Sequence, residues 1–191
     1  MKIAITGHTA GIGQAFTKIL ADRGHEIVGL SKRHGDNIRN TAKIMEKIVP
    51  CDMLINNAQA GYAQTELLYA VWQAWRDQPG KHIWCIGTTM TQAPVDQAVP
   101  GQSDMAMSQY RNQKIALDDA IAQLRNKTHS PIITMIRPGA VATQLGQTAN
   151  WPYCEVDAWA NTVVSTMLLA NEQGMRYNEL TLSAAKNRVP L

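Results

Sequence analysis

The sequence predicts one α/β domain over residues 1–191, built as a doubly wound parallel sheet with helices on both faces. Two observations predict this fold class. Short apolar runs alternate with longer amphipathic segments along the chain, which is typical of parallel strands covered by helices. The first run also passes through a glycine-rich turn into an amphipathic helix. We therefore expect a three-layer α/β/α arrangement.

Each apolar run gives an expected strand and each amphipathic segment an expected helix. Strands are expected from residue 2 to the turn at Gly7 and over 26–30, 53–55, 81–86, 131–136 and 179–182, and helices over 14–23, 41–49, 64–76, 105–125 and 155–169. A further strand–helix–strand unit needs roughly 30 residues, and the segment from Arg33 to Asp52 is too short for one. We therefore expect the third strand of the usual order to be absent or vestigial.

The composition is that of an ordinary globular protein, with 45% hydrophobic and 17% charged residues and a net charge of +3. Without a run of lysine and arginine we expect no nucleic-acid partner. The cysteines Cys51, Cys85 and Cys154 are scattered, which favours free thiols over a disulfide or a metal site. Without a signal peptide or an apolar segment long enough to cross a bilayer, we expect a cytoplasmic protein with no membrane contact.

Three glycines, Gly7, Gly11 and Gly13, separate the first expected strand from the first expected helix. In a dinucleotide-binding turn the first glycine permits the tight turn, the second lets the backbone approach a pyrophosphate, and the third lets helix and strand pack closely. The free N–H groups and the positive dipole end of the helix then face the phosphates. The pattern predicts that a dinucleotide binds here.

The end of the second expected strand indicates which dinucleotide binds. An acidic residue there holds the ribose 2′-hydroxyl of NAD, whereas a basic residue accommodates the 2′-phosphate of NADP. This chain has Ser31, Lys32 and Arg33, and no acidic residue follows the strand until Asp36. We therefore expect NADP(H) to be favoured over NAD(H), with Lys32 or Arg33 and the Ser31 hydroxyl at the phosphate. A solvated basic turn is the alternative interpretation.

Tyr110 and Lys114 stand four positions apart in the helix expected over 105–125, so both side chains project from one face. A neighbouring ammonium favours the phenolate and so lowers the tyrosine pKa from its usual value near 10. Such a phenol can donate a proton to a carbonyl oxygen during reduction, or accept one from an alcohol during oxidation. The pair is therefore the candidate acid–base group, although Tyr-x-x-x-Lys also occurs by chance.

Four motifs in this order resemble those of the short-chain dehydrogenase/reductase family. They are Thr6-Gly-x-x-x-Gly-Ile-Gly13, Asn56-Asn57-Ala58, Tyr110-x-x-x-Lys114 and Pro138-Gly-x-Val-x-Thr143. On these motifs the chain is identified as a compact member of the family. The resemblance implies a Rossmann-type fold, an NAD(P)-dependent oxidoreductase, and a homodimer or homotetramer formed through the helices at 64–76 and 105–125.

The resemblance also implies roles for individual residues. Tyr110 would be the general acid or base, and Lys114 would hold the nicotinamide ribose and lower the tyrosine pKa. Thr88 would replace the family's serine as the hydrogen-bond donor to the substrate oxygen, with Thr89 as the fallback. No metal is implied. The residues implied to contact the cofactor are Gly7, Thr9, Gly11, Ile12, Gly13, Ser31, Lys32, Arg33, Asn57, Ala58, Pro138, Gly139, Val141 and Thr143.

Three features depart from the family pattern. Thr88 and Tyr110 are 22 residues apart, more than the family usually has, so the segment 91–103 is an insertion that acts as a lid or displaces the hydroxyl. The family's helix asparagine, which positions a proton-relay water near the lysine, has no counterpart. Gln59 replaces the glycine of the Asn-Asn-Ala-Gly motif.

The leading functional hypothesis is an oxidoreductase that moves a hydride between NADP(H) and a small carbonyl or alcohol. The main alternative is a catalytically weak or inactive dinucleotide-binding protein that acts as a sensor or binds a partner. An epimerase or dehydratase is a third possibility, disfavoured because no large C-terminal substrate domain is evident. The substrate pocket is expected between the segments 90–104 and 144–153, which carry no charge cluster, so the substrate and the reaction direction stay open.

Overall fold

The computed structural model describes residues 1–92, 103–127, 130–143 and 153–184. Every expected strand and helix is present, with ends shifted by a few residues at most. The strands are β1 (Lys2–Thr6), β2 (Glu26–Leu30), β3 (Met53–Asn56), β4 (His82–Ile86), β5 (Ile132–Pro138) and β6 (Glu179–Leu182). The helices are α1 (Gly11–Asp22), α2 (Thr41–Ile48), α3 (Ala63–Trp75), α4 (Asp104–Arg125) and α5 (Val156–Glu172), with the short 3-10 turns η1 (Lys32–His34) and η2 (Thr89–Thr91).

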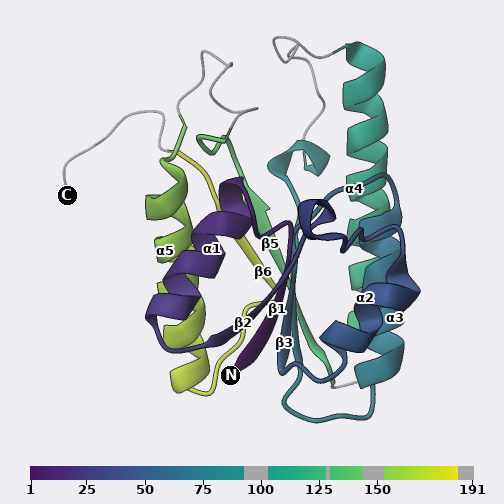
Figure 1. Ribbon diagram of the computed structural model, residues 1–191. Helices are drawn as coiled ribbons and strands as arrows, with labels where there is room; N and C mark the ends of the chain where they lie inside the picture. Colours follow the sequence, from purple (N-terminus) through teal and green to yellow (C-terminus); the bar gives the residue numbers. More distant parts are fainter. Residues whose placement is uncertain (93–102, 128–129, 144–152, 185–191) are drawn as a thin grey trace, which may run out of the picture.

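The strands form one parallel sheet in the order β2-β1-β3-β4-β5-β6. Helices α1 and α5 cover one face, and α2, α3 and α4 cover the other (Figure 1). This arrangement confirms the three-layer α/β/α fold predicted from the alternation of apolar runs and amphipathic segments. Each crossover helix returns the chain to the same end of the sheet, which is why all strands run parallel.

The strand order itself shows no missing third strand, and the expected loss concerns only the outer side of β2, where the described residues add no strand. The third strand in chain order, β3, pairs with β1 on one side and β4 on the other, and the strand order has no gap. The connection 31–52, all of which the structure describes, contains η1 and α2 but no strand. Its single helix brings the chain back to the free side of β1, so the short connection leaves β2 at the edge.

Apolar side chains fill the space on both sides of the sheet. Towards α1 and α5, the Phe16 ring lies between Trp84 and Trp159, with ring centroids 6.3 and 5.9 Å away. Towards α2, α3 and α4, Leu54 and Ile83 pack into a second buried cluster. The sheet is thus covered by apolar contacts on both faces, which fixes the helices relative to the strand ends.

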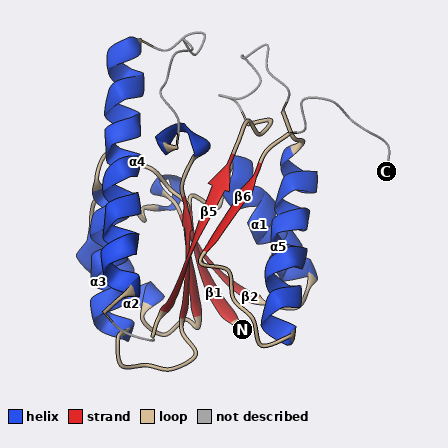
Figure 2. Ribbon diagram, turned by 180° about the vertical axis from the view of Figure 1, so that it is seen from behind, coloured by secondary structure: helices blue, strands red, loops and turns tan. Residues whose placement is uncertain are grey.

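The carboxyl ends of the parallel strands lie at one edge of the sheet, and α4 extends past them on one side (Figure 2). In open parallel sheets, ligands bind outside these strand ends. Each of the motifs found in the sequence lies at this edge, because each one follows a strand or sits on α4. Within the described residues, none of the helices combines the length and the apolar character that crossing a membrane requires.

Candidate active site

The glycine turn between β1 and α1 has the geometry that the sequence predicted. Gly7 has φ +71°, and its N–H donates to the Leu30 carbonyl oxygen at 2.7 Å, which holds the turn against the end of β2. A Cβ on Gly13 would lie 2.3 Å from the Gly7 carbonyl oxygen. Glycine at position 13 therefore allows α1 to start directly against the turn.

The N-terminus of α1 is open to an anion. Its N-cap residue, Ala10, offers no side-chain hydrogen bond, and the first turn contains no acidic residue. The first N–H groups of a helix have no partner within it, and no side chain among the described residues caps them here. Thr9 and Ile12 stand at this end, both partly exposed. The arrangement suits a phosphate group, which the helix dipole also favours.

Polar atoms without partners lie at the end of β2. Ser31 is only 6% exposed, and its buried hydroxyl has no hydrogen-bond partner among the described residues, as is also true of Nδ1 of His8. Lys32 and Arg33 are exposed beside them in η1. A buried hydroxyl next to two exposed cations fits a bound phosphate, since such a group would accept from the hydroxyl and pair with the cations.

The first acidic residue after β2 is not presented to a ligand. Asp36 is buried, and its carboxylate accepts from the Lys47 ammonium on α2 at 2.7 Å. Its backbone N–H also donates to the Ser31 carbonyl oxygen at 2.9 Å. The carboxylate is therefore committed to an ion pair inside the protein, and the end of β2 keeps a basic surface.

The Asn56-Asn57-Ala58 segment is fastened to the end of β1 through Thr6. The Thr6 hydroxyl accepts from the backbone N–H groups of Asn57 and Ala58, both at 2.9 Å, and the Asn57 side-chain amide donates to the Thr6 carbonyl oxygen at 3.0 Å. The same amide nitrogen lies 2.7 Å from where a Cβ on Gly13 would be. The structure thus brings Asn57 and the glycine turn together.

The segment after β5 also reaches the glycine turn. Pro138 is the last residue of β5, and the Gly139 N–H donates to the Leu182 carbonyl oxygen at 3.1 Å. Val141 is buried. The Thr143 methyl lies 3.3 Å from where a Cβ on Gly11 would be. The segment predicted to pass the nicotinamide therefore runs from the end of β5 to the start of α1.

Tyr110 and Lys114 project from one face of α4 towards the end of β4. The Lys114 ammonium lies 5.7 Å from the centre of the Tyr110 ring. Thr88, which follows β4, is buried, and its side chain forms a hydrogen bond with Tyr110. Thr88, the first choice of the two threonines, is the one bonded to the phenol.

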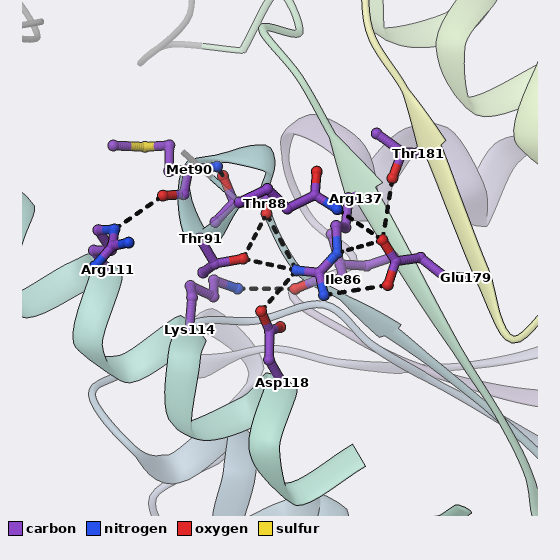
Figure 3. Close-up of polar contacts among 11 residues, drawn as sticks. Ile86, Thr88, Met90, Thr91, Arg111, Lys114, Asp118, Arg137, Glu179 and Thr181 are labelled. Atoms are coloured by element: carbon purple, nitrogen blue, oxygen red, sulfur yellow. Dashed lines mark hydrogen bonds and ion pairs between the residues drawn. The ribbon is translucent and has the colours of Figure 1, made fainter. Parts of the chain in front are cut away.

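Lys114 is held by two acceptors from other elements. Its side chain is 3% exposed, and the ammonium donates to the Ile86 carbonyl oxygen (Figure 3) and to Oε1 of Gln64, each at 2.8 Å. Burial lowers the Lys114 pKa to about 8, against the raising effect of Cys85 and Asp118. An ammonium has three donors, so one stays available for a ligand.

The pKa of Tyr110 differs from the sequence-based expectation. Burial raises it above its ordinary value, and the hydrogen bond with Thr88 acts against that rise. The lysine was expected to lower this pKa, but its ammonium is bonded to Gln64 and Ile86 instead of the phenol. Desolvation disfavours the phenolate, and it outweighs the lowering effect of the Thr88 hydrogen bond on the Tyr110 pKa.

Gln64 is a site residue that the motifs did not reveal. It is 3% exposed on α3, and its side-chain amide donates to the carbonyl oxygens of Asn56 at 2.7 Å and Ile86 at 3.0 Å. The Asn56 amide in turn donates to the Gln64 carbonyl oxygen at 2.8 Å. A polar residue on the apolar face of an amphipathic helix was the signal that could have identified it, because buried amides need partners.

Some predictions fall on residues that are not described. Residues 93–102 and 144–152 are outside the described ranges. They include most of the proposed lid at 91–103 and most of both predicted walls of the substrate pocket. Those expectations stay predictions.

A model of the NAD dependent epimerase/dehydratase family matches residues 3–144. This span contains the glycine turn, the end of β2, Thr88 and the Tyr110–Lys114 pair. No curated protein sequence matches the chain.

Solved structures of short-chain dehydrogenases and reductases share the fold over the full length of the chain. One from Vibrio parahaemolyticus has a TM-score of 0.77 at 15% identity and covers 99% of each chain. A 3-ketoacyl-(acyl-carrier-protein) reductase from Brucella melitensis, complexed with NADH, has a TM-score of 0.73 at 15% identity and covers 97% of each chain. An alcohol dehydrogenase from the archaeon Thermococcus sibiricus, complexed with 5-hydroxy-NADP, has a TM-score of 0.70 at 17% identity and covers 100% of this chain and 99% of that one.

The buried ammonium of Lys114 predicts a pH dependence of stability. Its pKa is about 8 in the folded chain, below the ordinary 10.5, so between these values the unfolded chain binds more protons and the free energy of unfolding rises with pH. We expect the stability of the wild type relative to Lys114→Met to increase by about 2 kcal/mol between about pH 7 and pH 9.5. Urea unfolding of both proteins measures this difference. A constant difference would mean that Lys114 titrates normally.

Proposed function

We propose that this chain, which belongs to the NAD dependent epimerase/dehydratase family, is an oxidoreductase that transfers a hydride between NADP(H) and a small carbonyl or alcohol. The observation that carries the proposal is the convergence of Thr88, Tyr110 and Lys114 at the strand ends, beside an uncapped helix N-terminus. A hydroxyl bonded to a phenol, with a buried ammonium within reach, is a set of groups that can protonate a carbonyl oxygen.

The features of the cofactor region support a dinucleotide. The N-terminal end of α1 would hold the pyrophosphate between Gly11 and Gly13. Asn57 would lie at a ribose, and the segment from Pro138 to Thr143 would lie beside the nicotinamide. When bound, the nicotinamide supplies or accepts the hydride. The protein's own contribution is to orient the two reacting carbons and to move the proton.

The proton is assigned to Tyr110. Its raised pKa keeps the phenol protonated at neutral pH, which is the form that carbonyl reduction requires. In that direction the phenol donates its proton to the substrate oxygen while Thr88 donates a hydrogen bond to the same oxygen. The Lys114 ammonium stabilises the phenolate that remains, and a proton from solvent restores the phenol. The reverse steps apply to alcohol oxidation.

The 2′-phosphate of NADP(H) is assigned to the end of β2. The unpartnered Ser31 hydroxyl and the exposed Lys32 and Arg33 support this choice, as does the ion pair that withdraws Asp36. The two cofactor-bound structures described above carry NADH in one case and 5-hydroxy-NADP in the other. The proposed preference for NADP(H) over NAD(H) therefore depends on this chain's own residues.

The first test removes only the phenol oxygen. We expect Tyr110→Phe to lower the rate of NADPH-dependent reduction of a panel of small aldehydes and ketones at least about 100-fold, because general acid catalysis contributes this much or more. NADPH affinity should be unchanged. Tyr177→Phe, at the opposite ends of the strands, is the control. Normal turnover by Tyr110→Phe would remove the tyrosine from the mechanism.

The same assay separates the competing functions. An oxidoreductase consumes one NADPH for each alcohol formed. An epimerase or dehydratase that uses its cofactor transiently would form product without net NADPH consumption. A sensor would bind NADPH but turn over no substrate of any class. Measuring product formation and NADPH absorbance in the same reaction distinguishes these outcomes.

The second test addresses cofactor choice by fluorescence titration with NADPH and NADH. The wild type should bind NADPH more tightly, and Arg33→Ala should weaken NADPH binding about tenfold while leaving NADH binding unchanged, because one charge-assisted contact to the phosphate is lost. Arg39→Ala is the matched control, since Arg39 is an exposed arginine in the same connection. Equal affinity of the wild type for both cofactors would contradict the assignment.

We also propose a homodimer or homotetramer that associates through α3 and α4. Tyr69 on α3 and Ile115 on α4 are large apolar side chains exposed on these helices. Light scattering after gel filtration should give a molar mass that is a multiple of the chain mass. The double variant Tyr69→Glu/Ile115→Glu should have the mass of a single chain, because association would bury its two added charges at the contact. A monomeric wild type at micromolar concentration would refute the proposal.

A further inference from the structure

A buried arginine outside the predicted site joins several of its parts. Arg137 is the penultimate residue of β5 and is 7% exposed. Its guanidinium lies between the turn from Thr88 to Thr91, Asp118 on α4 and Glu179 on β6 (Figure 3). Arginine presents its N–H donors in a planar fork, so it can bind several acceptors at fixed angles.

Two carboxylates balance the buried charge. Nε and Nη2 of Arg137 donate to the Glu179 carboxylate on β6, at 2.7 and 3.3 Å. Nη1 donates to Oδ2 of Asp118 on α4 at 2.8 Å. Burial alone would lower the Arg137 pKa, but the hydrogen bonds and charges of these two carboxylates raise it. The guanidinium therefore stays charged and firmly held.

A third set of Arg137 contacts reaches the turn from Thr88 to Thr91, which follows β4. Nη1 of Arg137 also donates to the Thr91 hydroxyl at 2.8 Å and to the Thr88 carbonyl oxygen at 3.4 Å. The Thr91 hydroxyl donates in turn to the same Thr88 carbonyl oxygen at 3.3 Å. Arg137 thus fixes the backbone of Thr88 directly and through Thr91.

Asp118 connects this arginine to the helix that carries the phenol. Tyr110, Lys114 and Asp118 follow one another at intervals of four residues along α4, so they share one face. Through Asp118 and Thr91, one guanidinium is bonded to both elements that supply the catalytic hydroxyls. Its position at the end of β5 also places it next to Pro138, where the predicted nicotinamide segment begins.

We infer that Arg137 is a positioning residue, which clamps the turn from Thr88 to Thr91 against α4 and thereby holds the Thr88 hydroxyl in hydrogen-bond contact with Tyr110. This inference rests on the proposed function for its catalytic consequence, but the contact itself exists without cofactor or substrate. The bonds to Asp118 and Glu179 are enough to satisfy the buried charge. The bonds to the turn add a function that charge balance does not require.

Thr91→Val separates positioning from stability, because it removes the hydroxyl link while both ion pairs of Arg137 remain. Arg137→Lys keeps the positive charge but cannot reproduce the fork of donors. Arg23→Met is the matched control, since Arg23 joins α1 to α5 through Asn161 and Ser165, away from the strand ends that carry the site. All three are compared with the wild type.

The first readout needs no activity. Isotope-labelled tyrosine followed by NMR gives the titration of the Tyr110 phenol in the protein without ligands. The Thr88 hydrogen bond lowers this pKa, so loosening the turn should raise it in Thr91→Val and Arg137→Lys and leave it unchanged in Arg23→Met. Lys114 is the charged group beside the ring, and it is retained in every variant. An unchanged titration in both clamp variants would overturn the inference.

The second readout is turnover. We expect Thr91→Val and Arg137→Lys to lower kcat for carbonyl reduction about tenfold or more, because small displacements of catalytic groups are costly, with the Kd for NADPH unchanged. Thr91→Val should also keep the thermal midpoint of the wild type. If the titration shifts but the wild type reduces no carbonyl, the clamp stands and the proposed function fails. If the wild type is active and neither variant changes kcat or the titration, the clamp fails alone.

Discussion

The burial of one ammonium group organises the centre of this molecule. Lys114 is almost fully removed from water, and a buried cation is tolerated only where acceptors surround it. The acceptors are the carbonyl oxygen at the end of β4 and the side chain of Gln64 on α3. Gln64 is itself bonded to the end of β3. The same charge therefore links α4 to the end of β4 and to α3, and it adds to the apolar contacts that position α4, on which Tyr110 lies one turn away.

A second buried cation, Arg137, complements Lys114 on the other side of the turn from Thr88 to Thr91. Lys114 binds the end of β4 from α4, while Arg137 binds the residues just beyond it, Thr88 and Thr91, from β5. The hydroxyl of Thr88 lies between these two anchors and meets the phenol. Contact with solvent would weaken these hydrogen bonds, but Lys114 and Arg137 are both buried. The hydroxyls proposed to be catalytic are thus preorganised before any ligand binds.

The sequence predicted the parts of this arrangement that depend on local pattern. The strands, helices, glycine turn and Tyr110–Lys114 pair follow from periodicity and spacing within short segments. Gln64 and Arg137 were missed because their partners are far away in the chain and come together only in the fold. The direction of the Tyr110 pKa was wrong for the same reason, since burial is a property of the packed structure. The strand order could be read only from the structure, because segment length does not tell on which side of β1 the chain returns.

The central claim is that the glycine turn and the phenol on α4 belong to one site, with a reduced nicotinamide nucleotide between them. A crystal structure of the protein with NADPH tests this most directly. The pyrophosphate should lie at the N-terminus of α1 and the nicotinamide ring beside the Tyr110 hydroxyl, between α4 and the segment that follows β5. A nucleotide bound elsewhere, or a nicotinamide ring turned away from that hydroxyl, would contradict the claim.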